Sequence, residues 1–231
     1  MKVSRVFLSC LVVVAATAVV ASAADRLQMS RKSSAAAVRV PLGGVLYDQT
    51  GGQSGAGVAS QDFESAYDAY DAQAADDFVV PPGGWSVNEV FAAGQYSVAG
   101  PVTNMNVQFF VNAAGLPGAL VPGCNYVNVP ATADGLGNVT VPLSPPCALV
   151  PGPYWVSAQA RLDFGTGGQW YWNGVTPPAG VSGVWQNPGG GFGVCPTWTP
   201  TPTCIPGADA NQAFALSGVP LPVELQHFSI E

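Results

Sequence analysis

The feature that most constrains this chain is a series of short runs in which apolar and polar residues alternate. In the run at 154–162, every second residue from Tyr154 to Leu162 is apolar, and the residues between them are mostly polar. A period of two is typical of strands that bury one face, whereas runs of helical period are almost absent after residue 24. Strands are therefore expected at 44–48, 77–80, 85–94, 103–112, 126–130, 138–143, 154–162, 169–173, 183–186, 212–218 and 223–230.

Turn signals punctuate these runs at regular intervals, including "VPPGGW", "AAGLPG", "ADGLGN" and "VPGPY". Many short strands with no helices between them predict an all-β fold, an antiparallel β-sandwich of jelly-roll-like type, with a closed barrel as the alternative. A long loop region rich in glycine, proline and tryptophan is expected at 165–204. Trp85, inside "PPGGWSV", is expected in the core.

The first residues have the pattern of a secretory signal peptide. Lys2 and Arg5 precede the apolar run "VFLSCLVVVAATAVV", and "ASAA" supplies the small residues of a cleavage site. We therefore expect a signal peptide at 1–24, a flexible basic arm at 25–41, one sandwich domain at 42–219 and a C-terminal tail at 220–231. Without a second apolar run of spanning length, a membrane anchor is the weaker alternative, and secretion as a monomer is expected.

Removal of the signal peptide leaves four cysteines, an even number suited to an oxidising compartment. Four cysteines allow three pairings. Cys195 and Cys204 enclose the short loop "PTWTPTPT", which favours a bridge between them and leaves Cys124 to pair with Cys147. Zinc binding is the alternative, but no CxxC pair is present and the single histidine, His227, is remote in sequence.

The charges are unevenly distributed along the chain, whose net charge is −7. Four basic residues lie in the arm (Arg26, Arg31, Lys32 and Arg39), and beyond them the only basic residue is Arg161. Phosphate binding requires lysine and arginine, so nucleic acid is excluded as a partner of the domain. The arm is expected to remain flexible, with folding back onto the acidic domain as the alternative.

Several segments resemble a group of bacterial secreted and cell-surface proteins. They are "SQDFESAYDAYDAQAADDFVVPPGGWSVNEVFAAG", "FFVNAAGLPGALV", "VWQNPGGGFGVC" and "NQAFALSG", which together extend from Ser60 to Gly218. In that group an "ADDF-V-P-GW" strand opens a β-sandwich and an "F-LSG" strand closes it, so the resemblance implies architecture but no chemistry. The ending "LPVELQHFSIE" is similar to a spacer that precedes an anchoring tail in some relatives, and we expect release rather than anchoring.

Tryptophans gather in the 165–204 region. Trp170 and Trp172 share one face of an expected strand, Tyr171 takes the other, and Trp185 follows in the next strand. Exposed aromatic rings stack on sugar rings, so these four residues are candidates for a carbohydrate-binding strip. The alternative is that the same rings fill a core that is poor in long aliphatic side chains.

The stretch "ESAYDAYDAQAADDF" combines acids with aromatic residues at helical spacing. Phe63, Tyr67, Tyr70 and Ala74 could share one face of a short amphipathic turn. Carboxylates this close together repel one another unless they are exposed or bridged, and Ca²⁺ is the available bridge outside the cell. Candidate ligands are Asp68, Asp71, Asp76 and Asp77, with Gln73; the alternative is a solvated acidic loop.

No catalytic signature stands out. "GGQSGAG" lacks the spacing of a nucleophile elbow, and a lysine nucleophile is absent because Lys32 is the last lysine. The sequence therefore predicts a secreted, non-catalytic binding or surface-associated module whose ligand is a polysaccharide or another cell-surface component. The alternatives are a structural envelope or matrix protein and, third, a two-carboxylate glycosidase using an acid such as Asp163.

Overall fold

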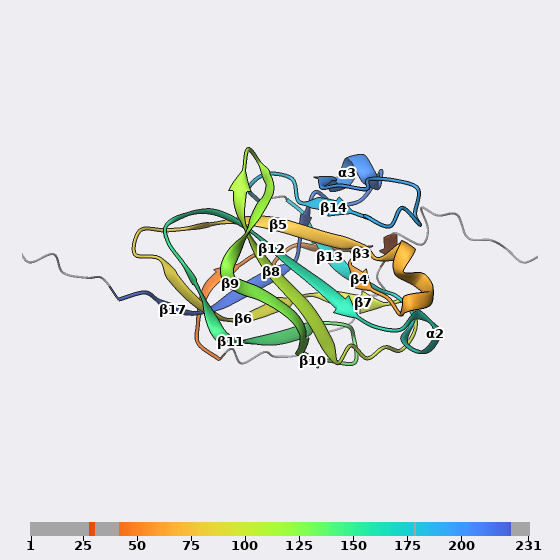
Figure 1. The fold of residues 1–231 in the computed structure, drawn as a ribbon, viewed down its shortest axis with the longest axis horizontal. Helices are drawn as coiled ribbons and strands as arrows, with labels where there is room; N and C mark the ends of the chain where they lie inside the picture. Colours follow the sequence, from red (N-terminus) through yellow and green to blue (C-terminus); the bar gives the residue numbers. More distant parts are fainter. Residues whose placement is uncertain (1–27, 31–41, 178, 223–231) are drawn as a thin grey trace, which may run out of the picture.

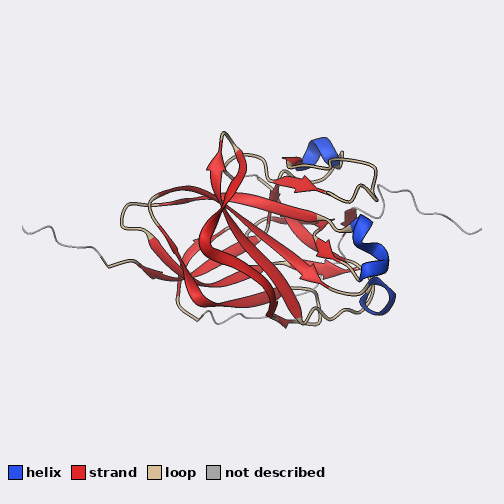
Figure 2. Cartoon of the chain, viewed as in Figure 1, coloured by secondary structure: helices blue, strands red, loops and turns tan. Residues whose placement is uncertain are grey.

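The computed structural model describes residues 28–30, 42–177 and 179–222, which form an all-β fold of three sheets (Figures 1 and 2). The predicted signal peptide, most of the arm and the strand expected at 223–230 lie outside the described residues. Within these residues, three short helical segments accompany the strands: η1 (Ser65–Tyr70), α2 (Phe164–Gly167) and α3 (Thr201–Cys204). The predicted antiparallel β-sandwich is confirmed.

Sheet C is the widest of the three. It runs in the order β15 (Thr199–Pro200), β14 (Val184–Gln186), β5 (Gln73–Val80), β12 (Gly152–Arg161), β8 (Asn104–Ala113) and β9 (Leu116–Pro130). These neighbours pair antiparallel, whereas β4 (Gln61–Asp62) pairs parallel to the end of β12.

Sheet B packs against sheet C. Its order is β10 (Thr132–Ala133), β11 (Val139–Leu149), β6 (Trp85–Ala92), β17 (Phe214–Pro220) and β2 (Gly44–Asp48). The chain crosses between the two sheets from β5 to β6, from β9 to β11 and again from β11 to β12, which gives the jelly-roll-like connectivity expected from the sequence.

Sheet A is the third sheet. Its strands are β1 (Gln28–Ser30), β3 (Gln53–Ala59), β13 (Trp170–Val175) and β16 (Asn211–Gln212), and β7 (Gly94–Tyr96) also pairs with β13. β1 comes from the arm that the sequence predicts to be flexible, and it pairs antiparallel with β3. These three residues of the arm therefore fold back onto the domain, as the alternative to a flexible arm predicted.

The core lies between the inner faces of sheets B and C, as the alternation predicts. On β12, Tyr154, Val156 and Ala158 are buried against sheet B. The opposite face of the same strand carries Trp155, which the alternation places outward, yet its side chain is also fully buried. Trp155 clusters with Ala75, Phe110 and Val184, and Trp198 from the glycine- and proline-rich region packs against this cluster, so part of the outer face of sheet C forms a second, smaller core.

Both predicted disulfides are present, Cys124–Cys147 and Cys195–Cys204. The first links β9 to β11 at a Cα–Cα distance of 5.2 Å and thereby joins sheet C to sheet B. The second closes a short loop beside α3. Within the described ranges, no helix is long and apolar enough to cross a membrane.

Candidate functional site

The tryptophan-rich strand belongs to the core, which corrects the prediction of an exposed sugar-stacking strip. The exposed fraction is 0% for Trp170, Trp172 and Trp185 and 4% for Tyr171. Each indole N–H donates a hydrogen bond to a backbone carbonyl, from Trp170 to Gly137, from Trp172 to Ala213 and from Trp185 to Ala59. Buried indoles with satisfied N–H groups stabilise a core, and no face of these rings is available to a ligand.

The four candidate calcium ligands are not brought together. Asp68 is exposed on η1, Asp71 follows the end of η1, and Asp76 and Asp77 point to opposite sides of β5. Among the described residues, no three acidic, histidine or cysteine side chains are close enough to share a metal ion. Calcium binding by this stretch is therefore a prediction that rests on the sequence alone.

Asp76 is instead a buried structural carboxylate. Its two oxygens accept hydrogen bonds from the side-chain amides of Gln49 (2.7 Å) and Asn211 (2.9 Å) and from the backbone N–H groups of Gln212 (2.6 Å) and Asp77 (2.9 Å). Complete burial raises the pKa of Asp76 well above its usual value, although these hydrogen bonds oppose the shift. Four N–H donors occupy the carboxylate, so it has no free position for a metal ion.

The acidic stretch begins with a turn of 3₁₀-helix that presents its aromatic side chains to one side. Backbone hydrogen bonds from Tyr67 N–H to Glu64 and from Asp71 N–H to Asp68 span three residues, as a 3₁₀-helix requires. The helix is interrupted at Tyr67, where φ is −123° and ψ is 15°. The predicted short turn is present as a 3₁₀-helix that carries Tyr67 and Tyr70. Phe63 precedes this helix and Ala74 lies on β5 in the core, so the predicted four-residue face is wrong for Ala74.

The segment "NPGGGFG" holds η1 in place. The side-chain amide of the buried Asn187 donates to the carbonyls of Ala69 and Asp71, each at 2.8 Å, and the N–H of Gly191 also donates to Ala69. A Cβ at Gly189 would lie 2.7 Å from the Cα of Ala69, so only glycine permits this close approach. The glycine run therefore serves to dock η1 onto the sandwich.

A pocket with a cavity volume of about 90 Å³ lies between η1, α2 and the segment "NPGGGFG", and we call it the aromatic pocket. Its lining residues are Phe63, Tyr67, Tyr70, Phe164, Gln169 and Phe192. η1 (orange) and α2 lie side by side at one end of the molecule in Figure 1. The rings of Tyr67 on η1 and Phe164 on α2 meet edge to face, with their centroids 5.8 Å apart. Tyr70 meets Phe192 in the same way at 5.2 Å.

Two rings at the mouth of the aromatic pocket are open to solvent. The exposed fraction is 41% for Tyr67 and 46% for Phe164, whereas Phe63 and Phe192 are buried at the base. Gln169 contributes an amide to the otherwise apolar lining, and its side-chain oxygen accepts a hydrogen bond from the Tyr171 hydroxyl (2.9 Å). The pocket thus combines exposed aromatic faces with a few polar groups, which is the usual composition of a small ligand site.

Glu64 fixes α2 at the mouth of the pocket. Its carboxylate accepts hydrogen bonds from the backbone N–H groups of Phe164 (2.7 Å) and Gly165 (3.3 Å) at the start of α2. Partial burial raises the pKa of Glu64, but hydrogen bonds from these groups and its own backbone outweigh that effect and lower it overall. The ionised carboxylate therefore positions the exposed Phe164 ring relative to Tyr67.

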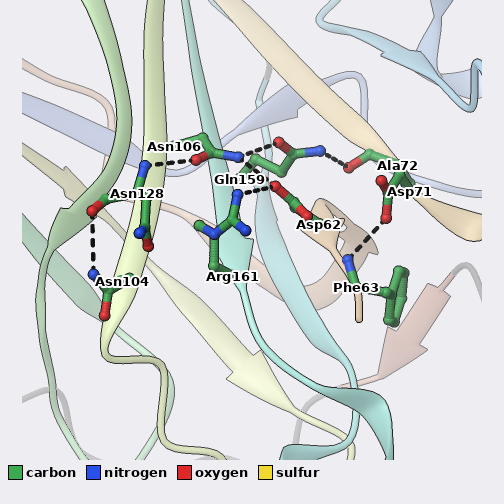
Figure 3. A network of polar contacts seen from close by, with 9 residues as sticks. All are labelled: Asp62, Phe63, Asp71, Ala72, Asn104, Asn106, Asn128, Gln159 and Arg161. Atoms are coloured by element: carbon green, nitrogen blue, oxygen red, sulfur yellow. Dashed lines mark hydrogen bonds and ion pairs between the residues drawn. The ribbon is translucent and has the colours of Figure 1, made fainter. Parts of the chain in front are cut away.

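Asp71 joins the pocket to a polar network on the outer face of sheet C (Figure 3). Its carboxylate accepts the backbone N–H of Phe63 at 2.8 Å, and burial raises the pKa of Asp71 to about 6, with help from the charges of Asp62 and Asp68. Asp62 lies next to Phe63 and pairs with Arg161 at 2.5 Å.

Sequence reasoning found half of the pocket. The spacing of Phe63, Tyr67, Tyr70 and Ala74 indicated a common face, and the first three of these residues line the pocket. Phe164 and Phe192 lie about 100 residues or more farther along the chain, and only the tertiary fold brings them to the same place. Asp163, the candidate glycosidase acid, is exposed at the start of α2, and no acid is among the residues that line the aromatic pocket.

In comparisons with known proteins, no family model matches the chain and no curated protein matches it. The case for function therefore rests on the aromatic pocket and its surroundings.

Proposed function

We propose that this protein is a secreted, non-catalytic binding module and that its aromatic pocket holds part of a carbohydrate. The observation that carries the proposal is the pair of exposed rings, Tyr67 and Phe164, at the mouth of a preformed pocket. The apolar faces of sugar rings stack on aromatic side chains, and the neighbouring amide and carboxylates supply hydrogen-bond partners for hydroxyl groups. The tryptophan strip expected from the sequence has no part in this proposal.

The size of the cavity restricts how a sugar could bind. A closed cavity of about 150 Å³ accommodates benzene, so about 90 Å³ is too small to enclose a whole sugar ring. A ring would stack on Tyr67 and Phe164 at the mouth, while a substituent such as a hydroxymethyl or acetyl group reaches toward Phe63 and Phe192. We therefore expect the pocket to select one end or one exposed substituent of a glycan.

Two alternatives remain in other classes. A structural envelope or matrix protein would need no ligand, and the extensive cores and two disulfides would suit that role equally well. A two-carboxylate glycosidase would need two acids facing each other across the ligand. The aromatic pocket favours binding over both, because its lining is preformed, partly exposed and without acids.

A glycan array with the purified protein tests the proposal. We expect retention of one class of glycan and, in calorimetric titrations with that glycan, at least about a tenfold loss of affinity for Tyr67→Ala and for Phe164→Ala. Both side chains are partly exposed, so both variants should fold.

Leu116→Ala is the matched control, because Leu116 is exposed to a similar degree (37%) on the β8–β9 hairpin, outside the pocket lining. Its affinity should equal that of the wild type. Retention of no glycan by the wild type, or unchanged affinity in both pocket variants, would overturn the proposal.

A further inference from the structure

We propose that the part of the outer face of sheet C not covered by Trp198 is a second binding surface, and that it holds the extended chain of an uncharged polysaccharide. We call this surface the amide platform; its residues are Gln73, Asn106, Gln108, Asn125, Gln159 and Gln186. The inference rests on the proposed function, because the aromatic pocket would take the end of the same glycan. Three observations support it: an ordered chain of side-chain amides, a polar network beside it whose one cation is paired, and the position of both next to the pocket.

The first observation is a row of four amides that crosses the sheet from β14 to β9. Gln186 donates to Gln73 (3.0 Å), Gln73 to Gln108 (2.5 Å) and Gln108 to Asn125 (2.9 Å), each from its side-chain nitrogen to the next side-chain oxygen. The side chains of Gln73 and Gln108 bond across the central strand β12. On this strand the small Ser157 is the register partner of Gln108 on β8 and of Ala75 on β5.

Each interior amide in this row has capacity left over. A primary amide has two N–H donors and an oxygen with two lone pairs. Gln73 and Gln108 each use one N–H and one lone pair within the row, so each retains one donor and one acceptor. Sugar hydroxyls are also both donors and acceptors. Because the row holds the amides in one orientation, a ligand would bind them with little loss of side-chain entropy.

The second observation is the network in Figure 3, which lies on the same face. The side-chain nitrogen of Asn106 donates to Gln159 and to Asp62, both at 2.9 Å, and its oxygen accepts the backbone N–H of Asn128 at 2.9 Å. Asn128 adopts a positive φ of 55° at an irregularity in the β8–β9 pairing, which turns its N–H toward Asn106. Asn128 is exposed, and Gln159 is partly exposed.

Charge decides the class of polysaccharide. The only ionic groups in the network of Figure 3 besides Asp71 are Asp62 and Arg161, which neutralise each other. Arg161 is the only lysine or arginine of the chain beyond Arg39, and the protein carries a net charge of −7 with histidine neutral. An anionic polysaccharide would meet repulsion and no free cation within the described part of the domain. The amide platform therefore suits a neutral glycan.

The third observation is continuity with the aromatic pocket. Asp62 and Asp71 belong to the polar network, and the residues next to them in sequence, Phe63 and Tyr70, line the pocket. Another part of the same sheet face is covered by Trp198 and its neighbours. A chain whose end occupies the pocket can therefore continue over the neighbouring amides, which Trp198 does not cover.

Chain length separates the two surfaces experimentally. Calorimetric titrations would use disaccharides and hexasaccharides of the cello, xylo and manno series, with oligogalacturonides as the anionic probe. We expect a neutral hexasaccharide to bind at least about tenfold more tightly than its disaccharide, and the anionic probe to bind more weakly than either. In the double variant Gln108→Ala/Gln159→Ala this advantage of length should disappear, while disaccharide affinity stays unchanged.

Thr132→Ala/Thr140→Ala, a cross-strand pair on β10 and β11 of sheet B, is the matched control and should retain the full advantage of length. Gln108→Glu provides a variant of equal size that removes the N–H donors, in case the double variant fails to fold. If length still improves affinity in the folded variants, the amide platform is wrong while the aromatic pocket stands. If the anionic probe binds best, the choice of a neutral glycan is wrong. If no probe binds the wild type, both proposals fail.

Discussion

Trp172 provides the sharpest test of the assignment of the tryptophan-rich strand to the core. Its side chain is fully buried, its ring lies 6.2 Å from that of Phe214, and its N–H donates to the carbonyl of Ala213 at 2.8 Å. Truncation of a buried tryptophan to alanine typically costs about 3–5 kcal/mol. For a domain of this length, Trp172→Ala should therefore lower the melting temperature by about 6–20 °C.

Trp172→Phe isolates the contribution of the indole N–H and the second ring. The carbonyl of Ala213 also accepts the backbone N–H of Ala93 (2.9 Å), so it keeps one partner when the indole is removed. The loss is then one hydrogen bond, about 0.5–1.5 kcal/mol, together with a modest packing defect. We expect Trp172→Phe to lose clearly less stability than Trp172→Ala.

Urea unfolding followed by far-ultraviolet circular dichroism measures both variants without depending on tryptophan fluorescence. Tyr67→Ala serves as the exposed comparison and should cost about 1 kcal/mol or less. A loss below about 1 kcal/mol for Trp172→Ala, accompanied by loss of glycan retention, would refute the reasoning, because it would show that the ring lies on a binding surface.

Three further predictions concern stability. Burial raises the pKa of Asp71 to about 6 and also raises the pKa values of Asp76 and Asp77, so the folded state holds protons that the unfolded state releases. The free energy of unfolding should therefore increase as the pH falls from 7.5 toward 5. A flat or opposite trend in urea titrations would contradict this. A Cβ at Gly94 would run directly into the indole of Trp170, so Gly94→Ala should destabilise by more than about 2 kcal/mol, while Gly135→Ala, which meets no neighbouring atom, should change the melting temperature little. The cysteines of the Cys124–Cys147 bridge are 23 residues apart, and those of Cys195–Cys204 are 9 apart. Replacing both cysteines of the first bridge by serine should therefore lower the free energy of unfolding by about 3 kcal/mol, more than the same change in the second. Equal losses in thermal unfolding would contradict the chain-entropy explanation.

Alternation in the sequence predicted most of the strands because a sandwich imposes a period of two on every strand that faces its core. The same pattern could have placed Asp76, since it shares the inner face of β5 with Ala74, Phe78 and Val80. Its burial was not predicted because a charged residue is normally expected at the surface, and the sequence does not show that Gln49 and Asn211 supply buried hydrogen-bond donors. Gln49 lies in the connection after β2 and Asn211 on β16, both distant in sequence from Asp76.

The coverage of sheet C was not predictable in the same way. Trp155 is on the outward face of β12 by alternation, and only the packing of Trp198 over it, together with Phe110, explains its burial. The aromatic pocket depends similarly on Phe164 and Phe192, which belong to short irregular segments without periodicity. Long-range contacts of this kind leave no mark on local sequence patterns.

The most direct test of the central claim is a nuclear magnetic resonance titration that observes the aromatic side chains of the protein with the glycan that it retains. We predict that the ring signals of Tyr67 and Phe164 shift on binding and show contacts with sugar ring protons, while the signals of Trp170 and Trp172 stay unchanged. Shifts at the buried tryptophans without any at Tyr67 and Phe164 would contradict the assignment of the aromatic pocket as the binding site.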